Sequence, residues 1–110
     1  GVEDLVRRCC SLAARMGAQL AHEPGVEVLN EVVLNQVLVR FGDDDALTRD
    51  VIRRVQEDGT CWLGGSTWQG KAVMRISVSS WATTEADADL SVDAIKRCHR
   101  DAVAALQSAG

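Results

Sequence analysis

The residue that most clearly suggests chemistry is Arg75, the one arginine inside the mostly apolar and small-polar segment at 71–79. Charged side chains are uncommon inside strands unless a partner or a ligand compensates them. The segment is expected to be a strand, in which alternate side chains point to opposite faces. Alternation alone favours a solvent-exposed arginine, because antiparallel sheets often leave one face in water. The core face would carry Ala72, Met74, Ile76 and Val78, and the other face would carry Val73, Arg75, Ser77 and Ser79.

Other potentially reactive residues lack the spacing that catalysis requires. His22 and His99 lie near no cysteine or serine in a recognised nucleophile–base pattern, so both are interpreted as hydrogen-bonded or surface histidines. The run Gly64-Gly65-Ser66 lies within an expected strand and opens no helix, which argues against a phosphate-binding loop. Glycines inside a strand instead indicate a bulge or a close approach by another backbone.

The four cysteines have no metal-ligand spacing, since two are adjacent and two are isolated: Cys9, Cys10, Cys61 and Cys98. A disulfide is possible, but free and mostly buried thiols in a cytoplasmic protein are the preferred interpretation. No metal site is expected. The tryptophans fall within one short region, and core packing is preferred over an interface role for Trp62, Trp68 and Trp81.

Length and composition indicate one globular domain. The chain has 110 residues, of which 46% are hydrophobic, and its formal net charge is −4. The acidic balance and the dispersed basic residues argue against a nucleic-acid or anionic-membrane partner. No apolar run approaches the roughly 20 residues that a membrane span needs, and no signal peptide is visible.

Periodicity and breaker residues predict the order helix, two strands, helix, two strands, helix. The expected elements are a helix at 3–21, strands at 26–29 and 32–41, a helix between Asp44 or Asp45 and Gly59, strands at 61–68 and 71–79 around a Gln69-Gly70 turn, and a helix from Thr84. The predicted fold class is α+β: a two-layer domain in which three helices cover one face of an antiparallel sheet of about four strands. The opposite face, with Arg75, would be bare.

Three runs of the sequence carry a resemblance to a known family. They are LNQVLVRF at 34–41, DGTCWLGG at 58–65 and MRISVSSWATTEADAD at 74–89. Together they resemble the C-terminal domain of the group II pyridoxal-phosphate-dependent amino-acid decarboxylases, which include glutamate and aromatic-amino-acid decarboxylases. The resemblance covers nearly all of residues 1–110 and implies the small domain of the aspartate-aminotransferase fold.

The resemblance also implies a role for Arg75, because the arginine of the matching strand binds the α-carboxylate of the amino-acid substrate in this family. A planar guanidinium binds a carboxylate through two parallel hydrogen bonds, which fixes its orientation. The implied activity is that of a carboxy-lyase that uses pyridoxal 5'-phosphate (PLP). The implied partners are a large PLP-binding domain and the partner subunit of a homodimer.

The sequence departs from a complete enzyme of this family. The family's Schiff-base lysine usually follows a histidine, whereas the only lysines here, Lys71 and Lys96, do not. We therefore expect no catalytic and no cofactor-binding residue in this chain, and no activity from it alone. Because the chain begins inside a helical pattern without methionine, it is expected to be a piece of a longer polypeptide from which the large domain is missing.

Two alternatives remain open, a stand-alone α+β binding or regulatory module and a purely structural domain with a solvated Arg75. The amino-acid substrate and the choice between decarboxylation and another PLP reaction are also open. If a large domain normally covers the sheet, an apolar patch with parts of Leu34, Leu38 or Trp62 should be exposed without it.

Overall fold

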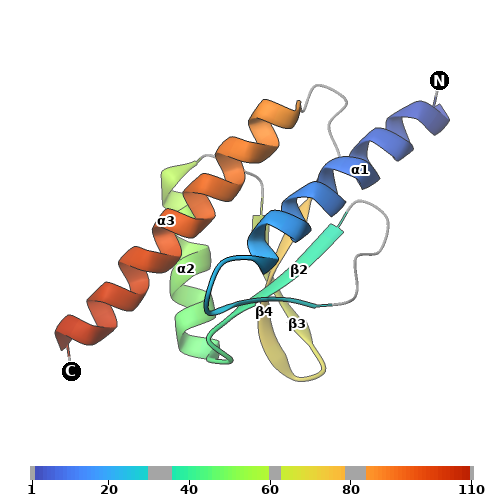
Figure 1. Ribbon diagram of the computed structural model, residues 1–110. Helices are drawn as coiled ribbons and strands as arrows, with labels where there is room; N and C mark the ends of the chain where they lie inside the picture. The colour runs from blue at the N-terminus through green and yellow to red at the C-terminus, as the bar shows by residue number, and fades with distance from the viewer. Residues whose placement is uncertain (1, 30–35, 60–62, 79–83, 110) are drawn as a thin grey trace.

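The computed structural model describes residues 2–29, 36–59, 63–78 and 84–109 (Figure 1). Its element order is the predicted one. The elements are α1 (Val2–Ala21), β1 (Val26–Val28), β2 (Gln36–Phe41), α2 (Asp45–Asp58), β3 (Leu63–Trp68), β4 (Lys71–Ser77) and α3 (Glu85–Ala109). The parts of the predicted strands that fall at 30–35, 60–62 and 79–83 lie outside the described residues.

The four strands form one sheet in the order β1-β2-β4-β3, and every neighbouring pair is antiparallel. The β3–β4 hairpin turns at Gln69 and Gly70, whose φ angles of 50° and 79° are both positive. Two positive φ angles are the mark of a type I′ turn, which matches the right-handed twist of the strands on either side. The predicted tight hairpin is therefore confirmed.

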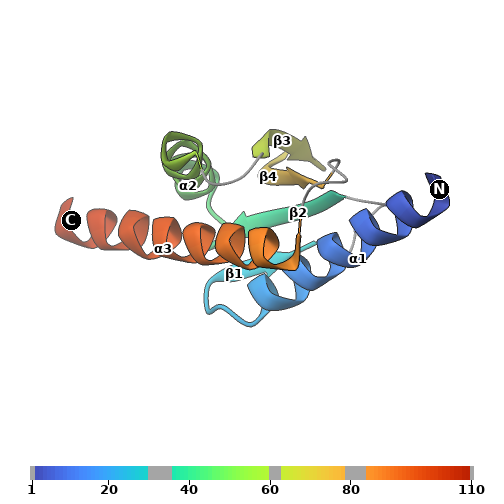
Figure 2. The same cartoon turned by 90° about the horizontal axis from the view of Figure 1, so that it is seen from above.

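The helices cover one face of the sheet. Gly17 of α1 faces Val28 and Val37, while Ile52 of α2 lies near Gly65. All three strand positions belong to the same face, because Val37 pairs with Ile76 and Gly65 pairs with Met74. Figure 2 shows α1 and α3 along the β1–β2 side of the sheet and α2 beside β3 and β4. The two-layer α+β prediction is confirmed.

The core lies between these layers, and alternation selects its sheet residues. Val37, Val39 and Phe41 of β2 and Met74 and Ile76 of β4 are at most 2% exposed. The helices supply apolar side chains at spacings of three and four, which place them on one helical face. These helical core residues include Leu12, Met16, Leu20, Leu47, Val51, Val55, Val92 and Ile95.

Both ends of α2 carry the expected caps. The Asp44 carboxylate accepts a hydrogen bond from the backbone N–H of Leu47 at 3.1 Å. Gly59 follows the helix at φ 72° and donates its N–H to the Val55 carbonyl, the left-handed ending for which glycine is favoured. At the start of α3, Thr84 and Asp87 exchange hydrogen bonds between backbone N–H groups and side chains.

We expect Asp44→Ala to lower the free energy of unfolding by about 1 kcal/mol, because it leaves the Leu47 N–H of α2 without its capping acceptor. Urea unfolding followed by far-UV circular dichroism measures this change. Asp101→Ala is the matched control, since Asp101 is exposed inside α3. Equal losses in the two variants would show that the cap contributes nothing specific.

Candidate functional site

Arg75 lies in β4 with its side chain exposed on the sheet face that no helix covers. It pairs with Leu38 of β2 on one side and with Gly64 of β3 on the other. Directly paired residues of antiparallel strands project to the same face. A leucine, an arginine and a glycine therefore form one row across three strands, and we call it the Arg75 row.

The predicted alternation in β4 is confirmed where the structure describes it. Ala72, Met74, Ile76 and Val78 are buried, whereas Arg75 is exposed and Ser77 is half-buried. The expectation of a bare opposite face needs one correction, because Val73 shares that face with Arg75 and is 0% exposed. Arg40 of β2 shares the face as well and is 5% exposed. The face is thus closed around Val73 and Arg40 and open at Arg75.

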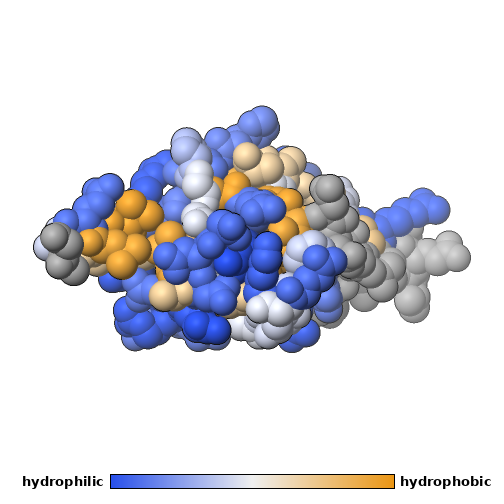
Figure 3. All heavy atoms as spheres, turned by 90° about the horizontal axis from the view of Figure 1, so that it is seen from below, coloured by the Kyte–Doolittle hydropathy of each residue, from blue (hydrophilic) through white to orange (hydrophobic). Residues whose placement is uncertain are grey.

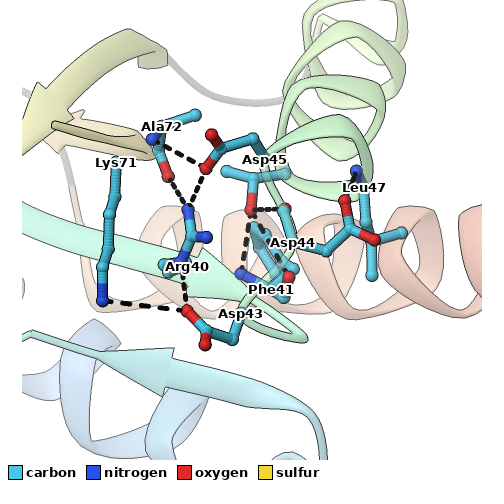
Figure 4. Close-up of polar contacts among 9 residues, drawn as sticks. Arg40, Phe41, Asp43, Asp44, Asp45, Leu47, Lys71 and Ala72 are labelled. Atoms are coloured by element: carbon cyan, nitrogen blue, oxygen red, sulfur yellow. Dashed lines mark hydrogen bonds and ion pairs between the residues drawn. The ribbon is translucent and has the colours of Figure 1, made fainter.

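Arg40 is held by a polar cluster at the start of α2 (Figure 4). Its Nε donates to Asp43 at 2.9 Å, and its Nη1 donates to Asp45 at 2.5 Å and to the Ala72 carbonyl at 2.8 Å. The Ala72 N–H donates to the same Asp45 oxygen at 3.1 Å. Lys71 lies 4.0 Å from Asp43. A buried guanidinium is tolerated when its donors meet carboxylates and carbonyls in this way.

This cluster supplies hydrogen bonds to the backbone of β4 beyond the point where the pairing of β2 with β4 ends. The ladder ends at the pair Val39–Met74, and two residues further on Phe41 would face Ala72. Phe41 instead donates its N–H to the Thr48 hydroxyl at 3.1 Å. The Arg40 and Asp45 side chains satisfy the Ala72 carbonyl and N–H that β2 leaves unpaired. The cluster thereby fixes the end of β4 that lies three residues before Arg75.

The hydrogen bonds of Arg40 lower the pKa of both carboxyl groups that accept them. For Asp43 the hydrogen bond from Arg40 is the largest cause, followed by the charge of Lys71. For Asp45 the Arg40 hydrogen bond is again the largest, followed by the Ala72 N–H. The same contacts raise the pKa of Arg40. The sequence predicts a helix that begins at Asp44 or Asp45, but it does not reveal the pairing of Asp45 with Arg40.

Arg75 differs from Arg40, because no described residue makes a hydrogen bond or an ion pair with its guanidinium. By contrast, Arg15, Arg53, Arg54, Arg97 and Arg100 each pair with an acidic side chain. The Arg75 guanidinium keeps its planar set of donors available to a ligand that approaches the open face. Its assignment as a carboxylate ligand stays a prediction.

Both lysines of the chain lie within the described residues. Lys71 is exposed beside the hairpin turn, and Lys96 is half-buried on α3. Neither lysine lines the pocket that the structure describes on α3. The described residues also contain no group of three or more His, Cys, Asp or Glu side chains that could hold a metal ion. Across the same ranges no helix has the length and apolar character of a membrane span.

The structure describes some of the remaining sequence candidates. Cys9 and Cys98 are buried free thiols, Cys10 is a half-buried free thiol, and Cys61 lies outside the described residues. Trp68 is half-buried in β3 and does not belong to the core, whereas Trp62 and Trp81 fall outside the described ranges. Of the predicted apolar patch only Leu38 is described, and it is half-buried.

The interpretation of His99 was wrong, because this histidine is neither hydrogen-bonded nor on the surface. It is 5% exposed, its ring centroid lies 5.1 Å from that of Phe41, and its Nδ1 has no hydrogen-bond partner among the described residues. It borders a shallow pocket of about 270 Å³ between Pro24 and Val103. Figure 3 shows apolar surface gathered on this side, toward the C-terminal end of α3, where Leu106 is 53% exposed. The residues that line the pocket include no member of the Arg75 row.

Comparison with solved structures identifies the fold. A structure of TDC from Oryza sativa with PLP and tryptamine matches with a TM-score of 0.82 at 17% identity, over 89% of this chain and 23% of that one. Tryptophan decarboxylase from Catharanthus roseus, in complex with L-tryptophan, gives 0.83 at 15% identity, over 90% and 22%. The cysteine desulfurase CsdA from Escherichia coli gives 0.73 at 18%, over 89% and 26%. The chain has the fold of a segment of these enzymes.

These likenesses confirm the fold that the sequence resemblance implied, and the chain spans about a quarter of each matched structure. No protein-family model matches the sequence. Because a desulfurase shares the fold with the decarboxylase, the fold alone does not select the reaction. The side chains of the open face, and not the fold, therefore determine which chemistry this domain can support.

We expect Asp45→Asn to lower stability at pH 7, because a neutral amide no longer compensates the buried Arg40 charge. The pKa of Asp45 is lowered in the folded chain from the ordinary 3.8. The carboxylate therefore contributes stability above pH 3.8 and loses that contribution as the pH falls further. Urea unfolding between pH 7 and pH 3 should show that the free energy of unfolding falls less with acidification in the variant than in the wild type. Asp93→Asn is the control, and an identical acid loss in wild type and Asp45→Asn would contradict the cluster.

Burial lowers the pKa of His99, whereas nearby Glu23 raises it and Arg100 lowers it. His99 therefore binds a proton more readily in the unfolded chain than in the folded chain. The free energy of unfolding then falls as the pH drops below about 6.5. The loss should reach at most about 1.4 kcal/mol per pH unit. We expect His99→Phe to flatten this slope between pH 7.5 and pH 5.5, whereas His22→Gln, at an exposed position, keeps it. A slope unchanged in His99→Phe would rule out His99 as its source.

Proposed function

We propose that this chain is the substrate-capping domain of a PLP-dependent amino-acid decarboxylase, in which Arg75 binds the α-carboxylate of the substrate. One observation carries the proposal. Arg75 extends from the helix-free face of β4, and no described residue pairs with its guanidinium. The fold shared with a tryptophan decarboxylase and with TDC crystallised with PLP supports the same proposal.

A carboxylate is the ligand that fits this arginine best. A guanidinium offers parallel N–H donors in a planar fork, and a carboxylate offers two oxygens at matching separation. Two hydrogen bonds fix the plane of the carboxylate as well as its position. In a decarboxylase this orientation determines which bond of the substrate is aligned for cleavage. Arg75 thus acts by binding and orienting the substrate.

The rest of the chemistry comes from outside the described residues. Neither lysine of this chain fits a Schiff-base role, so the proposal requires a second domain that holds PLP and its lysine. The sheet face that carries Arg75 is the surface of this chain that would turn toward that domain. Amino-acid specificity would be determined mainly by the PLP-binding domain and a partner subunit. Decarboxylation is preferred over desulfuration because the MRIS motif around Arg75 resembles the decarboxylases.

We expect Arg75→Lys, in the complete PLP-containing protein, to lower kcat/KM by about 10-fold to 150-fold. The variant keeps the charge but loses the two-pronged geometry, and a lost charge-assisted hydrogen bond costs about 1.5–3 kcal/mol. Carbon dioxide release from L-tryptophan, L-glutamate and L-2,4-diaminobutyrate measures the effect. PLP absorbance should stay unchanged, because Arg75 is assigned to the substrate.

Arg97→Lys is the matched control, since Arg97 is exposed on α3 in the helical layer and pairs with Asp58. Equal kcat/KM for wild type and Arg75→Lys would remove Arg75 from the site. A protein that binds no PLP and releases no carbon dioxide from any of the three amino acids would favour a stand-alone binding or regulatory module.

A further inference from the structure

Gly64 stands directly opposite Arg75 in the β3–β4 ladder, and the fold itself gives no reason for a glycine there. Glycine weakens the interior of a strand, because it has the greatest backbone freedom to lose and no side chain to pack. A glycine in such a position normally reflects a special backbone conformation, a bulge or a close approach by another group.

The backbone conformation does not require glycine. The glycines with positive φ are Gly25, Gly42, Gly59 and Gly70, and Gly64 is not among them. The β3–β4 register also runs without interruption from Leu63–Ile76 to Trp68–Lys71. A bulge would place two residues of one strand opposite a single residue of the other. Neither a left-handed turn nor a bulge explains Gly64.

Packing within the described residues does not require glycine either. A Cβ built on Gly64 would meet nothing within 4 Å. By contrast, a Cβ on Gly17 would lie 3.6 Å from Val28, and one on Gly42 would lie 3.1 Å from Leu47. The space above Gly64 is open, and Gly64 pairs directly with Arg75, whose guanidinium has no partner among the described residues. The remaining explanation is a group that lies outside the described residues.

We infer that Gly64 provides the clearance through which a carboxylate ligand reaches Arg75. This inference rests on the proposed function and adds a residue that determines which ligands fit. The Arg75 row is asymmetric, because Arg75 pairs with a leucine on the β2 side and with a glycine, which has no side chain, on the β3 side. The carboxylate therefore lies over Gly64, and its two oxygens meet the guanidinium from the β3 side. A β-branched side chain at position 64 would occupy the space of the ligand.

The first experiment asks whether the fold needs this glycine. Urea unfolding of the 110-residue chain should give Gly64→Ala and Gly64→Val midpoints equal to or above the wild-type midpoint, because strand propensity rises and nothing clashes. Gly65→Ala is the matched control on the neighbouring position and the helix-covered face, where the added Cβ would lie 3.9 Å from Ile52. A clear loss of stability in both Gly64 variants would show that the fold requires glycine and would overturn the inference.

The second experiment asks whether the ligand needs the space. In the complete PLP-containing protein, Gly64→Val should raise KM for the best of the three test amino acids by about 10-fold or more, the scale of a single misfitting methylene group. Gly64→Ala should give a smaller rise, and Gly65→Ala should leave KM unchanged. The inhibition constant of the corresponding amine, which lacks the carboxylate, should change little in Gly64→Val.

The outcomes separate the inference from the proposed function. If Arg75→Lys lowers kcat/KM while Gly64→Val leaves KM unchanged, the proposed function stands and the role of Gly64 is overturned. If Gly64→Val loses PLP without a change in KM, a polypeptide segment occupies the space and the carboxylate assignment is overturned. If Arg75→Lys has wild-type kinetics, the proposed function and the inference both fall.

Discussion

The ion pair between Arg40 and Asp45 determines how the sheet and the second helix meet. One carboxylate at the start of α2 accepts from the Arg40 guanidinium and from the Ala72 N–H, while Arg40 donates to the Ala72 carbonyl. Three elements are thereby joined at the point where the β2–β4 ladder stops. Without both partners, the backbone groups of Ala72 would need water or another donor and acceptor. The position of this end of β4, three residues before Arg75, depends on this junction.

The same junction explains why one arginine on this sheet face is buried and paired whereas another is exposed. Arg40 lies where the chain turns into α2 and brings two aspartates within hydrogen-bond distance. Arg75 lies further along β4, between Leu38 and Gly64, neither of which has a side-chain acceptor. A buried charge needs partners within the fold, whereas water compensates an exposed charge, which then needs no partner in the same chain. The same sheet face thus carries Arg40, which is paired within the fold, and Arg75, which has no partner among the described residues.

The helices, strands and turns could be predicted because they depend on residues that are close in sequence. The polar junction and the burial of His99 could not be predicted, because they depend on contacts between residues far apart in sequence. The Asp44 cap, the Gly59 ending and the Gln69-Gly70 turn depend on residues close in sequence, so the sequence predicts them correctly. The exposure of Arg75 follows from alternation. The Arg40–Asp45–Ala72 junction joins positions up to 32 residues apart, and no spacing rule reveals it. His99 was misjudged for the same reason, because its burial depends on contact with Phe41 in a distant strand.

The Arg75 row carries more information about function than the fold does. A tryptophan decarboxylase and a cysteine desulfurase share this architecture, so helices and strands alone are compatible with more than one reaction. What distinguishes a site is the chemistry that the scaffold presents at one place. Here one guanidinium has no partner among the described residues, and its β3 neighbour is a glycine. Both features reduce what the isolated fold could gain from packing and pairing, and both are consistent with the proposal that a carboxylate binds at the Arg75 row.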